Sequence, residues 1–364
     1  MHTPSNLLLH HFVSTPGIGP RTLKTLWDQY DETSPIETFL DSLLQENIFS
    51  SSKIYALQKA LLDFSPKECT RNLDQYEIQL VSLKDDDYPP LLREIPDAPP
   101  LLYVRGNRSN LIQNTLLSLV GTRKPTRYGI DVARSLSREL AHMGITTVSG
   151  MALGLDGEVH RGTLEGNGLT VAVLGNGLSD SCIAPRTHFS LMNDIIASGG
   201  TIVSELPPST KASPGTFPMR NRIVAGMTRA TLIIEASRRS GTLITAELAL
   251  DYNREVLAIP GSIFSPLSEG PHYLIRSGAT LVHTIQDIIA LLDISREARG
   301  HTKDTSQLQD TEKKIYTLLE DGPKNREEIT KIIQISASEL GINLTILEMN
   351  GFIKDIGNGT YRKI

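Results

Sequence analysis

Short runs of consecutive apolar residues recur along the chain from Leu116 onward. Most end in a glycine or a small polar turn and are followed by a stretch with helical periodicity, which indicates alternating strands and helices. A strand that is apolar at consecutive positions must be covered on both faces. The pattern therefore predicts an α/β fold with an extended Rossmann-like, doubly wound and mostly parallel sheet. The seven predicted strands are residues 116–120, 145–148, 170–174, 201–204, 231–234, 256–259 and 280–282.

The segments that precede this sheet have different patterns. Residues 1–70 have helical periodicity and predict a small helical domain. The Gly17-Ile18-Gly19 turn in it resembles a helix-hairpin-helix, although an ordinary tight turn also explains it. Residues 84–106 contain five prolines, which favour an extended lead-in strand. The central Rossmann-like domain is accordingly expected over residues 71–295.

The C-terminal segment begins with a polar stretch, residues 296–309, that is typical of a flexible linker. Three helical stretches follow, and Asn358-Gly359 signals a hairpin. Three helices and a β-wing predict a winged helix over residues 310–364, a shape that most often reads DNA. This segment has 8 Lys+Arg and 9 Asp+Glu, a net charge of −1, so a protein-binding or dimerising winged helix is an equal alternative.

Basic and polar turns follow several of the predicted strands. They lie at the carboxyl ends of the strands, where doubly wound sheets bind their ligands. Because these ends meet at one edge of the sheet, we expect the side chains of the turns to gather there, together with free backbone N–H groups at the start of a helix. The residues concerned are Arg123, Lys124, Arg220, Asn221, Arg222, Arg238, Arg239, Ser240, Gly241 and Thr242.

Composition narrows the possible ligands. No apolar stretch is long enough for a membrane span, and the first residues lack the pattern of a signal peptide, so a soluble, cytoplasmic protein is expected. Only Cys69 and Cys182 are present, which supports neither a disulfide framework nor a metal site.

The total net charge is −5, but residues 111–260 contain 14 Lys+Arg and 12 Asp+Glu, and 12 of the 14 are arginine. This bias weakly favours a nucleic-acid ligand, although arginines on exposed helix faces would look the same.

Catalytic patterns are missing. The turn at residues 121–129 is neither a dinucleotide-binding nor a Walker phosphate loop, and Gly175-Asn176-Gly177 reads as a tight turn. Asp156 and His160 could form an acid–base pair, but a capping Asp and a hydrogen-bonded His explain them without chemistry. We expect no enzyme activity and no cofactor. A sheet edge with arginines, backbone amides and the aromatic Phe217 suits single-stranded nucleic acid, unless Phe217 belongs to the core.

Several long motifs resemble the DNA-processing protein A family, DprA, also called Smf. They are YPPLLREIPDAPPLLYVRG, VGTRKPTRYG, VSGMALGLDGEVHRGTLEGNGLTVAVLGNGL, SELPPSTKASPGTFPMRNRIVAG, IIEASRRSGTLITAELAL, REVLAIPGS and GPHYLIRSGATLV. The resemblance implies a Rossmann-like domain that binds single-stranded DNA and forms a homodimer, a helical domain before it, often of the sterile-alpha-motif kind, and a winged helix after it. It also implies a role in natural transformation and recombination, in which incoming single strands are protected and the recombinase RecA is loaded onto them, without a cofactor.

The resemblance assigns a basic pocket and backbone donors to particular residues. One departure is Ala184-Pro185 with His188, where the family usually has Tyr-Pro and Asn. The resemblance therefore assigns no site residue to this segment. The pocket falls on Arg123, Lys211, Phe217, Arg220 and Arg222, and the donors on Ser149, Gly150, Ser240, Gly241 and Thr242.

Two rival functions remain open at this stage. A Rossmann-like nucleotide phosphoribohydrolase would use a catalytic glutamate, but Glu247 stands at the wrong distance from Ser240-Gly241-Thr242. A duplex-DNA regulator would act through the winged helix. The near-neutral charge of the winged-helix segment argues against this function, because DNA binding depends on positive charge.

Overall fold

The structure is a computed structural model of the chain, and it describes residues 2–30, 35–46, 48–112, 115–292, 308–319, 322–350, 352–355, 357 and 359–363. The chain divides into two compact units, Met1–Arg296 and Glu297–Ile364. Most of the predicted linker, residues 296–307, lies outside the described residues. Within the described ranges no helix is both long and apolar enough to cross a membrane.

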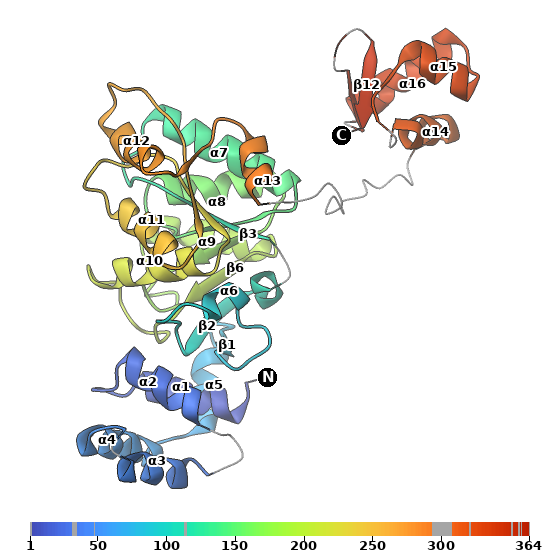
Figure 1. Cartoon of the computed structure of the whole chain (residues 1–364). Helices are drawn as coiled ribbons and strands as arrows, with labels where there is room; N and C mark the ends of the chain where they lie inside the picture. Colours follow the sequence, from blue (N-terminus) through green and yellow to red (C-terminus); the bar gives the residue numbers. More distant parts are fainter. Residues whose placement is uncertain are drawn as a thin grey trace. The chain divides into compact units, whose positions relative to one another are not determined.

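Five helices open the first unit (Figure 1). Three of them have proline in the first turn, where its missing N–H costs no hydrogen bond. Phe12, Trp27 and Leu40 are fully buried between them. The predicted boundary at residue 70 lies inside the fifth helix, and side chains from both sides of it share one hydrophobic core. The helices are α1 (Pro4–Val13), α2 (Pro20–Gln29), α3 (Ile36–Gln45), α4 (Ser51–Leu62) and α5 (Pro66–Asp74).

A nine-stranded sheet forms the centre of the first unit. The seven predicted strands are all present within about a residue of the expected bounds, and they run parallel, which confirms the predicted sheet. Two antiparallel strands extend it at one edge, β1 (Gln79–Ser82) and β2 (Leu101–Gly106), with the short helix α6 (Pro90–Arg93) between them. The seven are β3 (Leu116–Val120), β4 (Thr146–Ser149), β5 (Thr170–Val173), β6 (Thr201–Ser204), β7 (Ala230–Ile233), β8 (Glu255–Ala258) and β9 (Thr280–Leu281).

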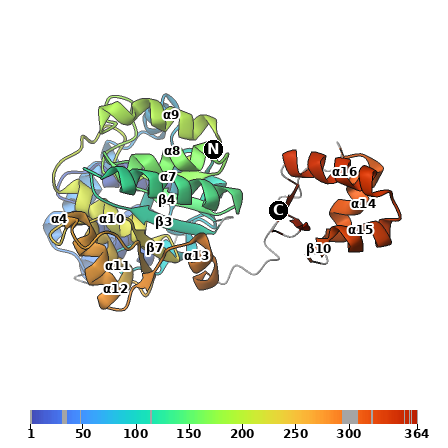
Figure 2. The same ribbon diagram turned by 90° about the horizontal axis from the view of Figure 1, so that it is seen from above.

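The strand order is β1-β2-β6-β5-β4-β3-β7-β8-β9, so the direction of chain progression reverses between β3 and β7. Helices cover both faces of the sheet (Figure 2). Side chains of α7, α8 and α13 pack on one face around Leu119, Leu232 and Leu257. The other helices of this region and the single turns of 3₁₀ helix complete the unit. Their bounds are α7 (Arg127–His142), α8 (Leu155–Glu165), α9 (Phe189–Ala197), α10 (Thr216–Gly226), α11 (Gly241–Asp251), α12 (Glu269–Arg276) and α13 (Ile285–Leu291), with 3₁₀ turns at Arg108–Leu111, Arg186–His188 and Pro266–Ser268.

The second unit has its own core, which includes Leu308, Ile315, Leu344 and Tyr361. Leu308, at the end of the predicted linker, belongs to this core. Its three strands form a small antiparallel sheet in the order β10-β12-β11. The elements are α14 (Asp310–Leu318), β10 (Lys324–Asn325), α15 (Arg326–Ile333), α16 (Ala337–Met349), β11 (Ile353–Asp355) and β12 (Thr360–Lys363).

Candidate functional site

The loop after β3 lies at the point where the strand order reverses, and Glu235 after β7 holds it there. Glu235 is buried, and its carboxylate accepts a hydrogen bond from the Thr126 backbone N–H at 3.0 Å and another from the Thr126 hydroxyl. The Thr122 N–H donates to the Glu235 carbonyl at 2.8 Å. Thr126 in turn caps the first turn of α7. These hydrogen bonds fasten the loop after β3, which carries Arg123 and Lys124, to the segment after β7 on the other side of the switch point.

A second loop packs against the first. The Leu155 N–H donates to the Thr122 carbonyl at 3.2 Å, which brings the loop after β4 onto the loop after β3. Gly154 makes this possible: its φ is +81°, and a Cβ there would lie 2.5 Å from the Thr122 oxygen. Any other residue would be strained in conformation and would clash. The site is thus preorganised in its backbone.

Arg123 and Phe217 form a cation–π contact at this edge. The Arg123 guanidinium carbon lies 5.1 Å from the centre of the Phe217 ring. Arg123 is exposed and Phe217 is half-buried next to Gly175, where a Cβ would come within 3.2 Å of the ring. A cation on an aromatic face is the arrangement that binds a phosphate and a stacked base together. Phe217 is not among the buried residues of the described hydrophobic cores.

Four further cations on the carboxyl-edge loops have no neutralising partner among the described residues. Lys124, Lys211, Arg238 and Arg239 are exposed, and none of them has an ion pair or side-chain hydrogen bond within the part of the chain that the structure describes. Their charge is therefore available to an anion. We call these four residues and Arg123 the edge cations.

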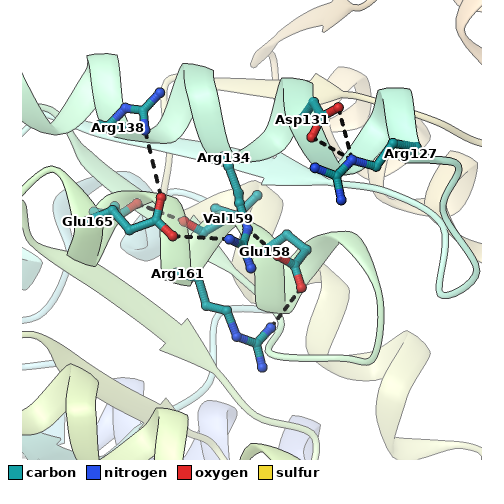
Figure 3. Close-up of polar contacts among 9 residues, drawn as sticks. Arg127, Asp131, Arg134, Arg138, Glu158, Val159, Arg161 and Glu165 are labelled. Carbon is teal, nitrogen blue, oxygen red and sulfur yellow. Dashed lines mark hydrogen bonds and ion pairs between the residues drawn. The ribbon is translucent and has the colours of Figure 1, made fainter.

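The arginines of α7 and α8 are different, because carboxylates neutralise them (Figure 3). Arg134 lies between two carboxylates, with its Nε 2.6 Å from Glu158 and a terminal nitrogen 3.2 Å from Glu165. Arg161 pairs with Glu158 at 2.9 Å, and Arg127 pairs with Asp131 at 3.1 Å. Part of the arginine excess of the sequence therefore lies in ion pairs on helix faces, as the sequence allowed.

Arg220 does not project from the sheet edge, and that expectation is wrong. It is only 4% exposed, and its guanidinium donates to the Val173 carbonyl. The guanidinium occupies the space beside Gly150, where a Cβ would be 2.0 Å from a guanidinium nitrogen. Burial lowers the pKa of Arg220, and the nearby Asp156 opposes this. Burial likewise raises the pKa of Asp156, and Arg220 opposes it. The two charges stabilise each other beneath the site.

Arg222 is also internal, at 8% exposure. It forms an ion pair with Glu205, whose side chain is 7% exposed, and its Nε lies 3.5 Å from Asp97. Both corrections have the same reason. Residues 217–222 (FPMRNR) belong to α10, which begins at Thr216, so the two arginines lie in a packed helix rather than in a loop. Asn221, between them, is half-buried.

Some of the predicted backbone donors are also buried, whereas others lie at the surface. Ser149 is fully buried, and its hydroxyl donates to the Leu119 carbonyl at 2.7 Å. Ser240 caps α11 by accepting from the Thr242 N–H at 3.2 Å, and Thr242 is buried. Gly241 is exposed at the first position of that helix, as the sequence predicted for its start. Of the five, Ser240 and Gly241 reach the surface of the site.

Asp156 and His160, which the sequence allowed either as an acid–base pair or as structural residues, are both buried. His160 is fully buried, and its Nδ1 is hydrogen-bonded to the Thr170 hydroxyl at 2.7 Å. Burial lowers its pKa to about 3, so it is neutral. Asp156 accepts from the Ala152 N–H at 3.4 Å. His188, in the segment that departs from the family pattern, hydrogen-bonds the Met151 carbonyl at 3.0 Å and so supports the loop after β4.

Sequence reasoning missed Glu235, which anchors the loop after β3. Its only signal is an acidic residue directly after a buried strand, and its partner Thr126 lies 109 residues away.

A doubly wound sheet with an aromatic–arginine stack and unpaired cations at its switch point defines a class of Rossmann-like protein suited to binding an anion. The comparisons give the particular family. The family model described as DNA recombination-mediator protein A matches residues 79–293, and the chain belongs to this family.

Three similar proteins illustrate the relationship. Protein Smf of Escherichia coli is 41% identical over 217 residues, which make up 60% of this chain and 57% of that protein. The structure of DprA from Streptococcus pneumoniae has a TM-score of 0.68 and 29% identity, covering 80% of this chain and 98% of that one. DNA processing protein A from Helicobacter pylori, whose structure is described in terms of its single-stranded DNA binding mode, has a TM-score of 0.53 and 29% identity, covering 60% of this chain and 97% of that one.

Proposed function

We propose that this chain binds single-stranded DNA at the carboxyl edge of its large sheet, protects incoming strands and loads RecA onto them in natural transformation and recombination. The observation that carries the proposal is the Arg123–Phe217 stack among the edge cations. The single-stranded DNA binding mode described for the Helicobacter pylori relative supports it. The proposed action is binding without chemical turnover and without a cofactor, in the cytoplasm.

The geometry suggests how a strand is held. Guanidinium and ammonium groups bind phosphates, whereas bases stack on an aromatic or guanidinium plane, and neither contact depends on base identity. In a duplex the base faces are occupied by neighbouring bases, so the Phe217 ring has no face to stack on. A preference for single strands follows. Because the loop that carries Arg123 is held by Glu235, little ordering free energy is needed on binding.

The remaining partner assignments belong to the same proposal. For the homodimer we infer a surface on α11, α12 and β9, because Leu250, Tyr273 and Leu281 are large, apolar and exposed there. For residues 310–364 we propose a winged helix that contacts protein rather than DNA. The helix that would enter a major groove is α16, and it contains no lysine or arginine, while Ile342 on it is 62% exposed.

The test is fluorescence anisotropy of labelled single-stranded and duplex oligonucleotides across a salt series. We expect tighter binding of the single strand, with a log–log salt slope of about −0.7 for each phosphate contact. Arg123→Ala with Phe217→Ala should weaken this binding, and Arg134→Ala, which removes a neutralised arginine on α7, is the matched control.

Other outcomes would contradict the proposal. Equal or stronger duplex binding that is lost on truncation after Arg296 would move the function to the C-terminal unit. Release of a free base from a nucleoside monophosphate, abolished by Glu247→Gln, would identify a phosphoribohydrolase.

A further inference from the structure

The loop after β8 carries the two most exposed large apolar side chains of the carboxyl edge. Ile263 is 81% exposed and Phe264 is 90% exposed. The Phe264 N–H is hydrogen-bonded to the Ser262 hydroxyl at 3.3 Å, and the Ser265 N–H to the Ser262 carbonyl at 3.0 Å, so the tip is a tight turn. An aromatic ring presented in this way lacks the burial that normally stabilises it.

The base of this loop is fastened to the neighbouring parts of the site. The Ala236 N–H donates to the Leu267 carbonyl at 2.8 Å, and the Gly270 N–H donates to the Ala236 carbonyl at 2.9 Å. On the other side, the Tyr128 hydroxyl donates to the Pro260 carbonyl at 2.7 Å. The loop is therefore held both to the segment after β7 and to the first turn of α7, which follows the Arg123 loop.

Two of the edge cations lie beside this attachment. Arg238 and Arg239 follow Ala236 by two and three residues, and they are exposed without an ion pair in the described part of the chain. Beyond the switch point, the carboxyl edge therefore carries two exposed cations, Arg238 and Arg239, and an exposed aromatic ring, Phe264. Arg123 and Phe217 supply the same two kinds of group, a cation and an aromatic ring, on the segments that follow β3 and β6.

We infer that the bound single strand continues across the switch point to the loop after β8, where Arg238 and Arg239 bind its phosphates and Phe264 stacks on one of its bases. The inference rests on the proposed single-strand binding and extends it to a second contact region. Two aromatic contacts on one rigid edge would make the site longer than the Arg123–Phe217 pocket alone.

The experiment compares the full chain with its Phe264→Ala variant on two labelled oligothymidylates, one of about 6 and one of about 20 nucleotides, lengths that bracket common single-strand site sizes. We expect Phe264→Ala to weaken binding of the long oligonucleotide by at least about fivefold, the lower end for one lost base stack, and to leave the short one unchanged. Arg238→Ala with Arg239→Ala should act in the same direction. Tyr55→Ala is the control, because Tyr55 is an aromatic of 68% exposure on α4.

Three other results would overturn the inference. Phe264→Ala with wild-type affinity for both lengths, while Phe217→Ala weakens both, would remove the loop from the DNA path and leave the proposed function intact. Loss of the dimer in sedimentation velocity, with equal weakening on both lengths, would assign Phe264 to the contact between two copies. Failure of the wild-type chain to bind either oligonucleotide would refute the proposed function itself.

Discussion

Replacing Arg222 by methionine should destabilise the first unit strongly, because the change leaves Glu205 as a buried carboxylate without its partner. The Arg222 side chain is 10% exposed and that of Glu205 is 7% exposed, so neither charge is well solvated. Removing one member of such a pair costs about 3–5 kcal/mol, since the remaining charge keeps its desolvation penalty. Methionine preserves much of the side-chain volume, so the loss reports the charge.

The assay is urea unfolding followed by the fluorescence of Trp27, the single tryptophan, which is buried in the core that the N-terminal helices share with the sheet. With a slope of about 3 kcal/mol per molar, the midpoint should fall by about 1 M or more. Adding Glu205→Gln should restore part of the loss, because the double variant no longer buries an unpaired charge. Arg134→Met is the control; its partly exposed ion pair is worth no more than about 1 kcal/mol. An unchanged midpoint, combined with weaker DNA binding, would refute this reasoning and make Arg222 a DNA contact.

The other predictions concern the site and its support. Arg123→Ala should reduce the magnitude of the salt slope by about 0.7. Phe217→Ala should lower single-strand affinity by about 1–3 kcal/mol and leave the slope unchanged. If anisotropy measurements find neither the slope nor the affinity changed, the stack is excluded from the site. Glu235→Ala should also weaken single-strand binding, because Thr126 and its loop lose their anchor, and an affinity equal to that of the wild type would show that the loop needs no anchor. The folded-state pKa of His160, about 3, lies below its unfolded value of about 6.5, so between these values only the unfolded chain takes up the proton. Stability should therefore fall as the pH drops below about 6.5, by about 1.4 kcal/mol per pH unit from this group; His160→Gln should flatten the profile of urea midpoints, and an equally steep profile in that variant would exclude His160 as the cause.

The sequence by itself determined the sheet and indicated the edge at which the candidate site lies. Runs such as Thr231–Ile234 are apolar at consecutive positions, and only a strand covered on both faces can bury them, so their positions could be predicted to within about a residue. The topology rule then predicted which edge of the sheet binds the ligand, because the turns after parallel strands meet there. Arg123 and Phe217 were found in this way, and the structure brings them into contact.

Only the tertiary structure decided which charges at that edge are free. Arg220 and Arg222 look like Arg123 in the sequence, but their partners are Val173 and Glu205, and Arg222 also meets Asp97, 125 residues earlier. Whether a guanidinium is buried depends on the rotation of its helix and on what distant segments place beside it. Local periodicity carries the backbone pattern, because neighbouring residues set it. The neutralisation of a charge is a long-range contact, and one sequence contains no local signal for it.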